Sequence, residues 1–363
     1  MEINVKDFKD VLNNLNISFN KKPLMEYQTF LKIDNGYLTI SDNNSALFTK
    51  IDCEEELQCL LPFETLKNLF DKFKENIATL TIKDNRANLK CGRSNTKINL
   101  GDFSKYPNLQ PKEIENSVVL RGEFLKNVID KCSFACGVET KKEILKGINI
   151  KCEKGLLQFT STDSYKLAYY SVDVEGIADF NFTIHKNDII KVAKLIKPED
   201  NVEIKYNDNT AVFHIGNYIY QSRILDGEYP DVRRIFPRNY NCRFEINRNN
   251  FIDALELINT IAKNEIDKKT KSLSSPIIMK TEGNNLRISC ESQSLGFSEN
   301  EVELDNIDGN IPIVACSLTI LLEEVKNIDN QTIIVEFAEA RRPILIKGND
   351  SNFKQIVLPI AID

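Results

Sequence analysis

Hydrophobic and polar positions along the chain follow one plan that occurs three times. Short segments with apolar residues at every second position flank polar turns, which is the pattern of a β-hairpin. Three such hairpins end in a glycine and lie at 78–92, 201–216 and 331–348. Because Gly92, Gly216 and Gly348 are separated by 124 and 132 residues, the repeating unit has the size of a domain rather than of a solenoid turn.

Two segments of each repeat have apolar residues at i, i+3 and i+4, the pattern of an amphipathic helix. The first helix of each repeat is predicted at 8–15, 124–132 and 251–261. The second is predicted at 63–73, 188–196 and 317–328. A strand–turn–strand unit lies between them, at 36–43, 155–163 and 283–291. The sequence therefore predicts an α+β fold of three tandem domains, each with two helices and antiparallel sheets, at 1–115, 116–242 and 243–363.

Composition and charge narrow the possible functions. The 363 residues include 47 Lys and Arg against 53 Asp and Glu, a formal charge of −6. A protein that holds nucleic acid by bulk electrostatics should be basic, so tight non-specific binding of that kind is excluded. His185 and His214 are the only histidines, which excludes a three-histidine metal site. We expect no metal and no cofactor.

Cysteine usage and the N-terminus indicate the compartment. The nine cysteines are scattered, and no two have Cys-x-x-Cys spacing, so we expect reduced thiols rather than a disulfide scaffold or a zinc ribbon. The N-terminus lacks an apolar signal core, and no apolar run approaches 18 residues. These features predict a soluble cytoplasmic protein without membrane contact.

Short motifs that suggest catalysis do not combine into an active site. Ser18-x-x-Lys21 and Ser41-Asp42-Asn43 match two motifs of the penicillin-recognising serine hydrolases, but the third, Lys-Thr-Gly, is missing. Asp163 near Lys166 is better explained as a turn aspartate that caps backbone N–H groups. His185 follows an apolar strand and His214 lies inside one, so both are expected to be structural, and Gly-rich phosphate loops are absent. We expect no catalytic residues, although turnover of an ester or amide substrate would revive the hydrolase interpretation.

Four segments together resemble a known family. They are Leu145-Lys-Gly-Ile-Asn-Ile, Leu157-Gln-Phe-Thr-Ser-Thr-Asp-Ser-Tyr-Lys-Leu-Ala168, Ile224-Leu-Asp-Gly-Glu-Tyr-Pro-Asp-Val-Arg-Arg-Ile-Phe-Pro237 and Ile356-Val-Leu-Pro-Ile-Ala-Ile-Asp363. In this order they resemble the bacterial sliding clamps, the β subunits of DNA polymerase III. The Asp-Gly-x-Tyr-Pro-Asp-x-Arg-Arg segment is the most specific part.

The resemblance implies a non-catalytic processivity factor for DNA replication. Two chains would join head to tail as a homodimer, and their six domains would form a ring around duplex DNA without reading its sequence. Partners would be the DNA polymerase III catalytic subunit, the clamp loader, and other polymerases and repair proteins with clamp-binding peptides. A clamp paralogue that acts as a protein-interaction scaffold without chromosomal loading is the alternative, and it would lack lysines that face DNA.

The resemblance also implies a groove for partner peptides between the second and third domains. Its residues in the second domain would be Leu145, Thr162, Ser164, Tyr165, Lys166, Leu167, Pro230, Arg234 and Ile235. Those in the third would be Ser274, Ser317, Ile320, Pro343, Ile356, Leu358, Pro359 and Ile360. Ser274 and Ile320 stand where the family often has aromatic residues, so a more open pocket is expected.

Two further sets of residues complete the expectations. Lysines that would face the DNA are Lys21, Lys22, Lys67, Lys72, Lys141, Lys142, Lys191 and Lys194, each of which could equally serve only to solvate a surface. The segments 95–100 and 295–302 are the candidate edge strands for the contact between chains, because unpaired strand edges seek partners.

Overall fold

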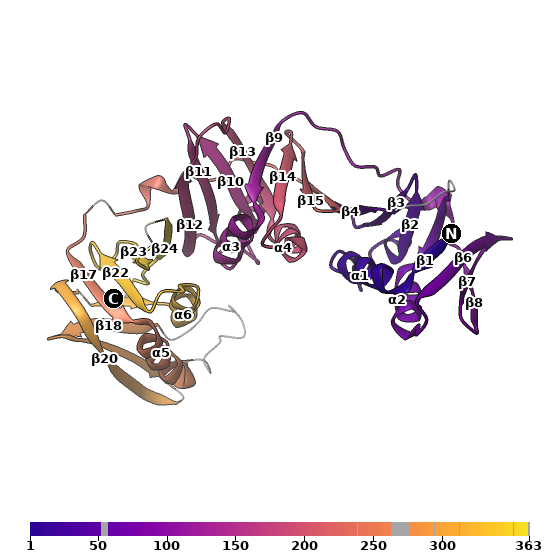
Figure 1. Cartoon of the computed structure of the whole chain (residues 1–363). Helices are drawn as coiled ribbons and strands as arrows, with labels where there is room; N and C mark the ends of the chain where they lie inside the picture. Colours follow the sequence, from indigo (N-terminus) through magenta and orange to yellow (C-terminus); the bar gives the residue numbers. More distant parts are fainter. Residues whose placement is uncertain are drawn as a thin grey trace. The chain divides into compact units, whose positions relative to one another are not determined.

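The computed structural model describes residues 1–51, 57–237, 239–262, 276–293, 295–311, 313–350 and 352–361. In these residues it contains six α-helices and antiparallel sheets, so the predicted α+β class is confirmed (Figure 1). The chain forms two compact units, each built from two segments of the sequence. Residues 1–129 and 187–225 form the first unit, and residues 130–186 and 226–363 form the second.

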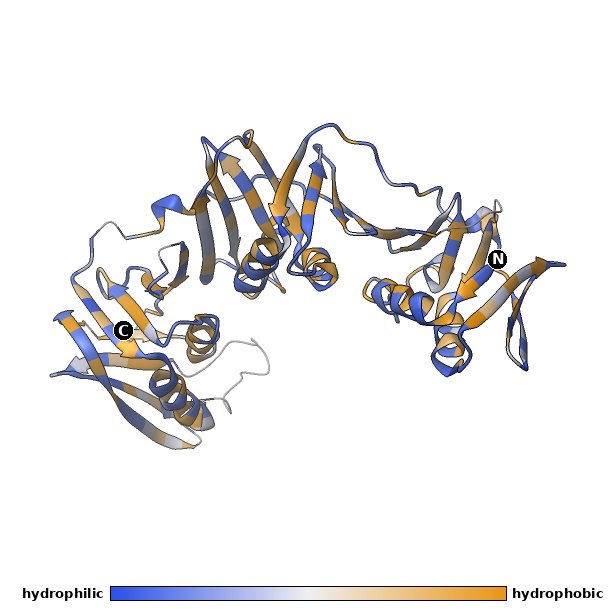
Figure 2. Ribbon diagram, viewed as in Figure 1, coloured by the Kyte–Doolittle hydropathy of each residue, from blue (hydrophilic) through white to orange (hydrophobic). Residues whose placement is uncertain are grey.

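The six helices agree with the predicted segments to within a few residues. They are α1 (Val5–Leu15), α2 (Phe63–Lys72), α3 (Gly122–Ser133), α4 (Lys186–Leu195), α5 (Arg248–Ala262) and α6 (Leu318–Lys326). Helix α1 illustrates the reason: the Asn4 side chain caps it by accepting from the N–H groups of Lys6 and Asp7. Its buried residues recur at helical spacing, and apolar and polar stripes run along the helices in Figure 2.

The first unit holds two sheets. The smaller has the strand order β1 (Glu2–Asn4), β6 (Ile77–Lys83), β7 (Arg86–Cys91) and β8 (Ser94–Asn99). The larger has the order β5 (Cys59–Pro62), β2 (Phe30–Asp34), β3 (Tyr37–Ser41), β4 (Ser45–Lys50), β16 (Tyr218–Arg223), β15 (Thr210–Ile215), β14 (Asn201–Tyr206) and β9 (Ser117–Arg121). Since β4 pairs with β16, strands of the first and second repeats share one hydrogen-bonded sheet.

The second unit is built on one sheet of twelve strands. Their order is β13 (Phe180–His185), β10 (Gly147–Glu153), β11 (Leu156–Thr162), β12 (Lys166–Asp173), β24 (Phe353–Val357), β23 (Ile344–Lys347), β22 (Thr332–Phe337), β17 (Cys242–Asn247), β20 (Gly296–Gly309), β19 (Asn285–Ser292), β18 (Ile277–Glu282) and β21 (Val314–Cys316). Helices α5 and α6 contribute Phe251, Leu255 and Leu321 to the apolar core of its C-terminal half. The β12–β24 pair joins strands of the second and third repeats.

Two glycines of the clamp-like segments have a steric role. A side chain at Gly147 would collide with the carbonyl oxygen of Ile184 on the neighbouring strand β13. Gly227 has a φ of +115°, a backbone conformation that other residues rarely adopt. The glycines in Leu-Lys-Gly-Ile-Asn-Ile and Asp-Gly-x-Tyr-Pro are therefore required by the backbone.

Candidate partner-binding groove

The predicted groove residues converge where β12 meets β24. Leu167 is paired with Ile356 across these strands, and both side chains are buried. A small apolar cluster surrounds them, separate from the main core of the C-terminal half. We call it the junction cluster; it consists of Leu167, Tyr169, Val232, Leu345 and Ile356, with Phe236 and Leu358 partly buried against it.

Four members of the junction cluster were not predicted. Tyr169 follows Leu167 at the strand period of two, and its ring centroid lies 5.3 Å from that of Phe236. Val232 and Phe236 lie inside the segment 224–237 that carried the resemblance. The strand alternation after Leu167 could have indicated Tyr169, and the clamp-like segment could have indicated Val232 and Phe236. No pattern in the sequence could indicate that Leu345 belongs to the cluster, because its position depends on the pairing of β23 with β24.

The loop before β12 is held in one shape by its own side chains. Asp163 Oδ1 accepts from the N–H groups of Tyr165 and Lys166 at 2.8 and 2.9 Å, so the predicted aspartate cap is confirmed. Thr162 Oγ1 donates to Lys166 O at 2.6 Å and accepts from Ser164 N at 3.1 Å. Ser164 has a φ of +82°, and the Tyr165 side chain is 66% exposed. The loop therefore presents Tyr165 to solvent from a fixed backbone.

Lys166 is placed differently from the exposed rim charge that a partner peptide would meet. Its side chain is buried, its ammonium forms an ion pair with Glu323 on α6, and it lies 5.5 Å from the centre of the Phe134 ring. Glu323 is 157 positions away, so no local pattern could indicate this contact. Lys166 therefore braces the loop against α6.

The segment after Pro230 contains two arginines, of which one forms ion pairs with described carboxylates and the other does not. Arg233 binds Asp231 through Nε at 2.9 Å and Glu153 through a terminal nitrogen at 3.0 Å. Its hydrogen bonds hold the pKa of Asp231 down at about 2. Arg234 is exposed and makes no ion pair with any described residue. Pro230 and Ile235 are exposed beside it.

The C-terminal segment lies along the same junction. Leu358 N donates to Tyr165 O at 2.9 Å, and Ile360 N donates to Ala315 O at 2.7 Å. Leu358 and Pro359 are partly buried, whereas Ile360 is 38% exposed. These hydrogen bonds fix a short apolar ridge next to the junction cluster.

The other predicted groove residues differ in where the structure places them. Ser317 caps α6, Ile320 packs on the main core, and Pro343 is partly exposed just before β23. Leu145 is fully buried and presents no surface to a ligand in this conformation. Ser274 lies outside the described residues.

A buried carboxyl group lies on α6 next to the Lys166 brace. Glu324 is fully buried, and neither carboxyl oxygen has a hydrogen-bond partner among the described residues. Burial raises its pKa well above 4.5, and the opposing effect of Lys166 is smaller. Glu324 is therefore neutral over a wider pH range than an exposed glutamate.

Glu324→Gln is expected to remove a loss of stability at high pH. Because the folded state holds this proton more tightly, the stabilisation is complete below the unfolded pKa of 4.5 and is lost as the pH rises through the folded pKa. Urea unfolding between pH 5 and 9 should show the variant gaining on the wild type by up to ~1.4 kcal/mol per pH unit. Glu323→Gln, at a partly exposed ion pair, is the control and should show no such gain. A difference between variant and wild type that did not change with pH would contradict a neutral Glu324.

The candidate DNA-facing lysines differ in how their amino groups are used. Lys67 pairs with Asp71 at 2.8 Å, and Lys191 pairs with Asp42 at 3.1 Å and with Asp188 at 3.5 Å. Lys191 is thus held by two carboxylates and is the least available for a phosphate. The exposed candidates are Lys21, Lys22, Lys72, Lys141, Lys142 and Lys194.

Comparison with known proteins identifies the class of this fold. The family model for the central domain of the DNA polymerase III beta subunit matches residues 119–231, and the model for its C-terminal domain matches residues 233–361. The beta sliding clamps of Staphylococcus aureus (strain Mu50) and Staphylococcus epidermidis are 26% and 27% identical over 275 and 276 residues. Each alignment covers 75% of this chain and 71% of the relative.

Solved structures extend the agreement to the whole chain. The beta chain of DNA polymerase III from Streptococcus pneumoniae matches with a TM-score of 0.92 at 20% identity, covering 99% of both chains. The sliding clamp of Bacillus subtilis matches with a TM-score of 0.89 at 21% identity, covering 100% of this chain and 99% of that one. The fold is thus that of the three-domain processivity clamps.

The chain belongs to the family of bacterial DNA polymerase III β sliding clamps. It is a non-catalytic processivity subunit that takes part in DNA replication. The sequence-based interpretation as a clamp is confirmed, and so is the expectation that the protein is not an enzyme.

Proposed function

We propose that two copies of this chain join head to tail as a ring around duplex DNA and tether replication and repair proteins through the junction cluster. The observation that carries this proposal is the full-length clamp fold, whose β12–β24 junction has a buried apolar cluster with Ile235 and Ile360 exposed beside it. Helices and sheets of three repeats, with the boundaries expected near residues 115 and 242, would supply half of the ring.

Two strand edges support the proposed contact between chains. Strand β8 pairs only with β7 among the described strands. Residues 296–303 of β20 pair only with β19, because β17 pairs with the later part of the strand. Each edge therefore leaves backbone hydrogen-bonding groups without a described partner, and these groups are available to another strand.

The charges on the two edges are complementary. Strand β20 carries Glu299, Glu301 and Glu303, of which the first two also pair with Arg287 on β19, whereas Lys97 lies on the edge strand β8. Opposite charges on two edges favour the pairing of one with the other over self-pairing. This favours a head-to-tail contact between the first repeat of one chain and the third repeat of its partner.

The proposed hold on DNA is topological. A net charge of −6 does not favour tight electrostatic binding, and a few exposed lysines suffice to keep phosphates near the ring while it slides. The binding would ignore base sequence. A cytoplasmic location follows from this role, because the template and the polymerase are there.

The junction cluster is suited to an extended peptide with apolar side chains. Anchors would pack against the partly buried Leu358 and the exposed Ile235 and Ile360, beneath which Leu167 and Ile356 form the buried floor, and Arg234 on the rim would orient a polar or acidic group. Such peptides would belong to the polymerase III catalytic subunit, the clamp loader, and other polymerases and repair proteins. Scaffolding of these partners without loading on DNA is the alternative function.

Retention on DNA should depend on whether the DNA is closed. After loading on nicked circular DNA by an ATP-driven clamp loader, the chain should co-elute with the circle and should be lost after a single cut, because a ring slides off an end. Replacing Lys21, Lys22 and Lys72 together by Ala should weaken salt-sensitive binding to short duplexes, since each phosphate contact adds to the salt dependence. Equal retention on cut and closed DNA would contradict encirclement, and failure to load at all would favour the scaffold.

A further inference from the structure

The four-stranded sheet of the first unit has a basic face that is turned away from the core of the repeat. Alternate side chains of β6, β7 and β8 point to this face, and across the strands Thr81 is paired with Asn88, and Asn88 with Lys97. The other alternate residues, such as Leu80 and Leu89, are buried. The exposed cations of this surface, which we call the basic face, are Lys83, Arg86, Lys90 and Lys97.

The cations of the basic face have no carboxylate to neutralise them. In the part of the chain that the structure describes, none of the four forms an ion pair. Glu2 on β1 is the one carboxylate on the strands of this face, and Thr79 on β6 separates it from Lys90. Lys83 and Arg86 are directly opposite each other on β6 and β7, where like charges destabilise a sheet. Folding therefore does not explain this arrangement of charge.

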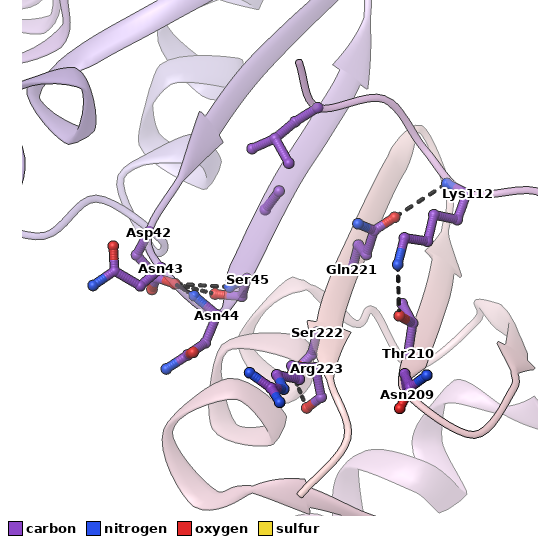
Figure 3. A pocket seen from close by; sticks show the side chains of 12 residues that line it. Asp42, Asn43, Asn44, Ser45, Lys112, Asn209, Thr210, Gln221, Ser222 and Arg223 are labelled. Atoms are coloured by element: carbon purple, nitrogen blue, oxygen red, sulfur yellow. Dashed lines mark hydrogen bonds between the residues drawn. The ribbon is translucent and has the colours of Figure 1, made fainter. Parts of the chain in front are cut away.

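In the second repeat, a segment of the chain covers the corresponding face. Counted from the glycine that ends each predicted hairpin, Arg86 occupies the position of Thr210. By the same count, Lys97 occupies the position of Gln221. Lys112 lies over these two residues of the second repeat: Nζ donates to Thr210 Oγ1 at 2.9 Å, and its backbone N donates to Gln221 Oε1 at 3.1 Å (Figure 3).

The third repeat covers the corresponding face as well. Val232 and Phe236 pack on it against Leu345 of β23, and Lys347 on the same strand binds Glu336 of β22 at 2.8 Å. Over the basic face of the first repeat lies no described segment, since all four of its cations are exposed. The first repeat therefore leaves open a charged face whose counterparts in the other two repeats are covered.

We infer that the basic face is a docking surface for an acidic, extended segment of a partner protein. Residues two apart on a strand are about 7 Å apart and neighbouring strands are about 4.8 Å apart, so the four cations lie within roughly 15 Å of one another. An extended segment of about five residues spans this distance, and its alternate side chains point to one side. Carboxylates at alternate positions would therefore reach several of the cations at once.

The other side chains of the face favour a peptide over a nucleic acid or a lipid surface. They are mainly threonines and asparagines, which form hydrogen bonds with peptide groups: Thr79, Thr81, Asn88, Asn95 and Asn99. Strands β1, β6, β7 and β8 contain no aromatic residue on which a base could stack. Ile77 is the one exposed large apolar residue on these strands, so little can insert into a lipid surface.

Calorimetric titration of the full chain with the peptide acetyl-Glu-Ser-Glu-Ser-Glu-Ser-Glu-amide at low salt tests the inference. The peptide should bind, and binding should weaken as salt is added, because exposed ion pairs are screened. The same peptide with Gln in place of each Glu should give no heat at the same concentration. Absence of binding by the Glu peptide, or equal binding of the Gln peptide, would overturn the inference.

Matched variants locate the binding on the basic face. Lys83→Thr/Arg86→Thr should weaken binding of the Glu peptide by about tenfold, and it keeps Lys97, which the proposed contact between chains also uses. Lys105→Thr/Lys197→Thr removes two exposed lysines outside the face and should leave binding unchanged. Unchanged affinity in the first variant would overturn the assignment.

Two further measurements on Lys83→Thr/Arg86→Thr separate docking from other roles of the face. Its melting temperature should equal or exceed that of the wild type, because a like-charge pair is removed; a lower value would show a structural role and overturn the inference. Its sedimentation should match that of the wild type, and a weakened dimer would assign the face to the contact between chains instead. A greater loss of affinity for a single-stranded oligonucleotide, or for vesicles containing phosphatidylserine, than for the Glu peptide would likewise overturn the choice of partner.

Discussion

Deleting residues 359–363 is expected to lower the affinity of a Gln-Leu-Phe-type peptide by about a hundredfold. The partly buried Pro359 and the exposed Ile360 form the end of the apolar ridge beside the junction cluster. If a peptide covers about 100 Å² of their apolar surface, the loss is ~2.5 kcal/mol, which converts to nearly two orders of magnitude in Kd. Calorimetric titration of the peptide into wild type and variant measures the change.

A shorter deletion gives the matched control. Removing residues 362–363 alone keeps Pro359 and Ile360, so peptide affinity should stay within about twofold of the wild type. Light scattering should give the same mass for both deletions as for the wild type, since the proposed contact between chains uses β8 and β20. Undiminished affinity after the longer deletion would place the partner site elsewhere.

Phe297→Asp is expected to convert the proposed dimer into single chains. Phe297 begins the free edge of β20, and its side chain is 61% exposed, so the substitution should leave the fold of one chain intact. A buried aromatic anchor of an interface contributes roughly 2 kcal/mol or more, and a carboxylate placed there adds a desolvation cost. Sedimentation over a range of concentrations should show the dissociation constant rising by at least about thirtyfold.

Val138→Asp is the control for this substitution. Val138 is 73% exposed and lies outside both proposed edges, so this variant should dimerise like the wild type. Lys97→Glu should also weaken the dimer, because it places a carboxylate opposite the acidic β20 edge. Dimers of full strength in Phe297→Asp would refute the proposed contact.

Local patterns in the sequence predicted elements well. The hairpin at 78–92 is β6 and β7, with its turn at Asp84 and Asn85 in the left-handed region that such turns require. The helix predicted at 63–73 is α2, whose buried residues Phe63, Leu66 and Phe70 keep the helical spacing. In both cases neighbours in sequence are neighbours in space.

Local sequence patterns could not predict the contacts between distant segments. The resemblance placed Leu167 and Ile356 in one groove, but their pairing across two strands was not predicted, because strand order depends on the whole fold. Lys166 was predicted only as one of the groove residues, and its ion pair with Glu323 is a contact that periodicity on either strand or helix cannot reveal. Leu145 was predicted as a groove residue, whereas its side chain is buried by the packing of distant segments.

The two shared ladders, β4 with β16 and β12 with β24, make the three repeats poor modules for independent expression. Cutting the chain near residue 115 would leave β16 without its neighbour and would expose a long, regular edge that includes Tyr218, Ile219 and Tyr220. Exposed edges of this kind promote aggregation. Duplication can copy and diversify the repeats as units of sequence. As units of folding they are not independent, because each repeat folds only when a strand of its neighbour pairs with the edge of its sheet.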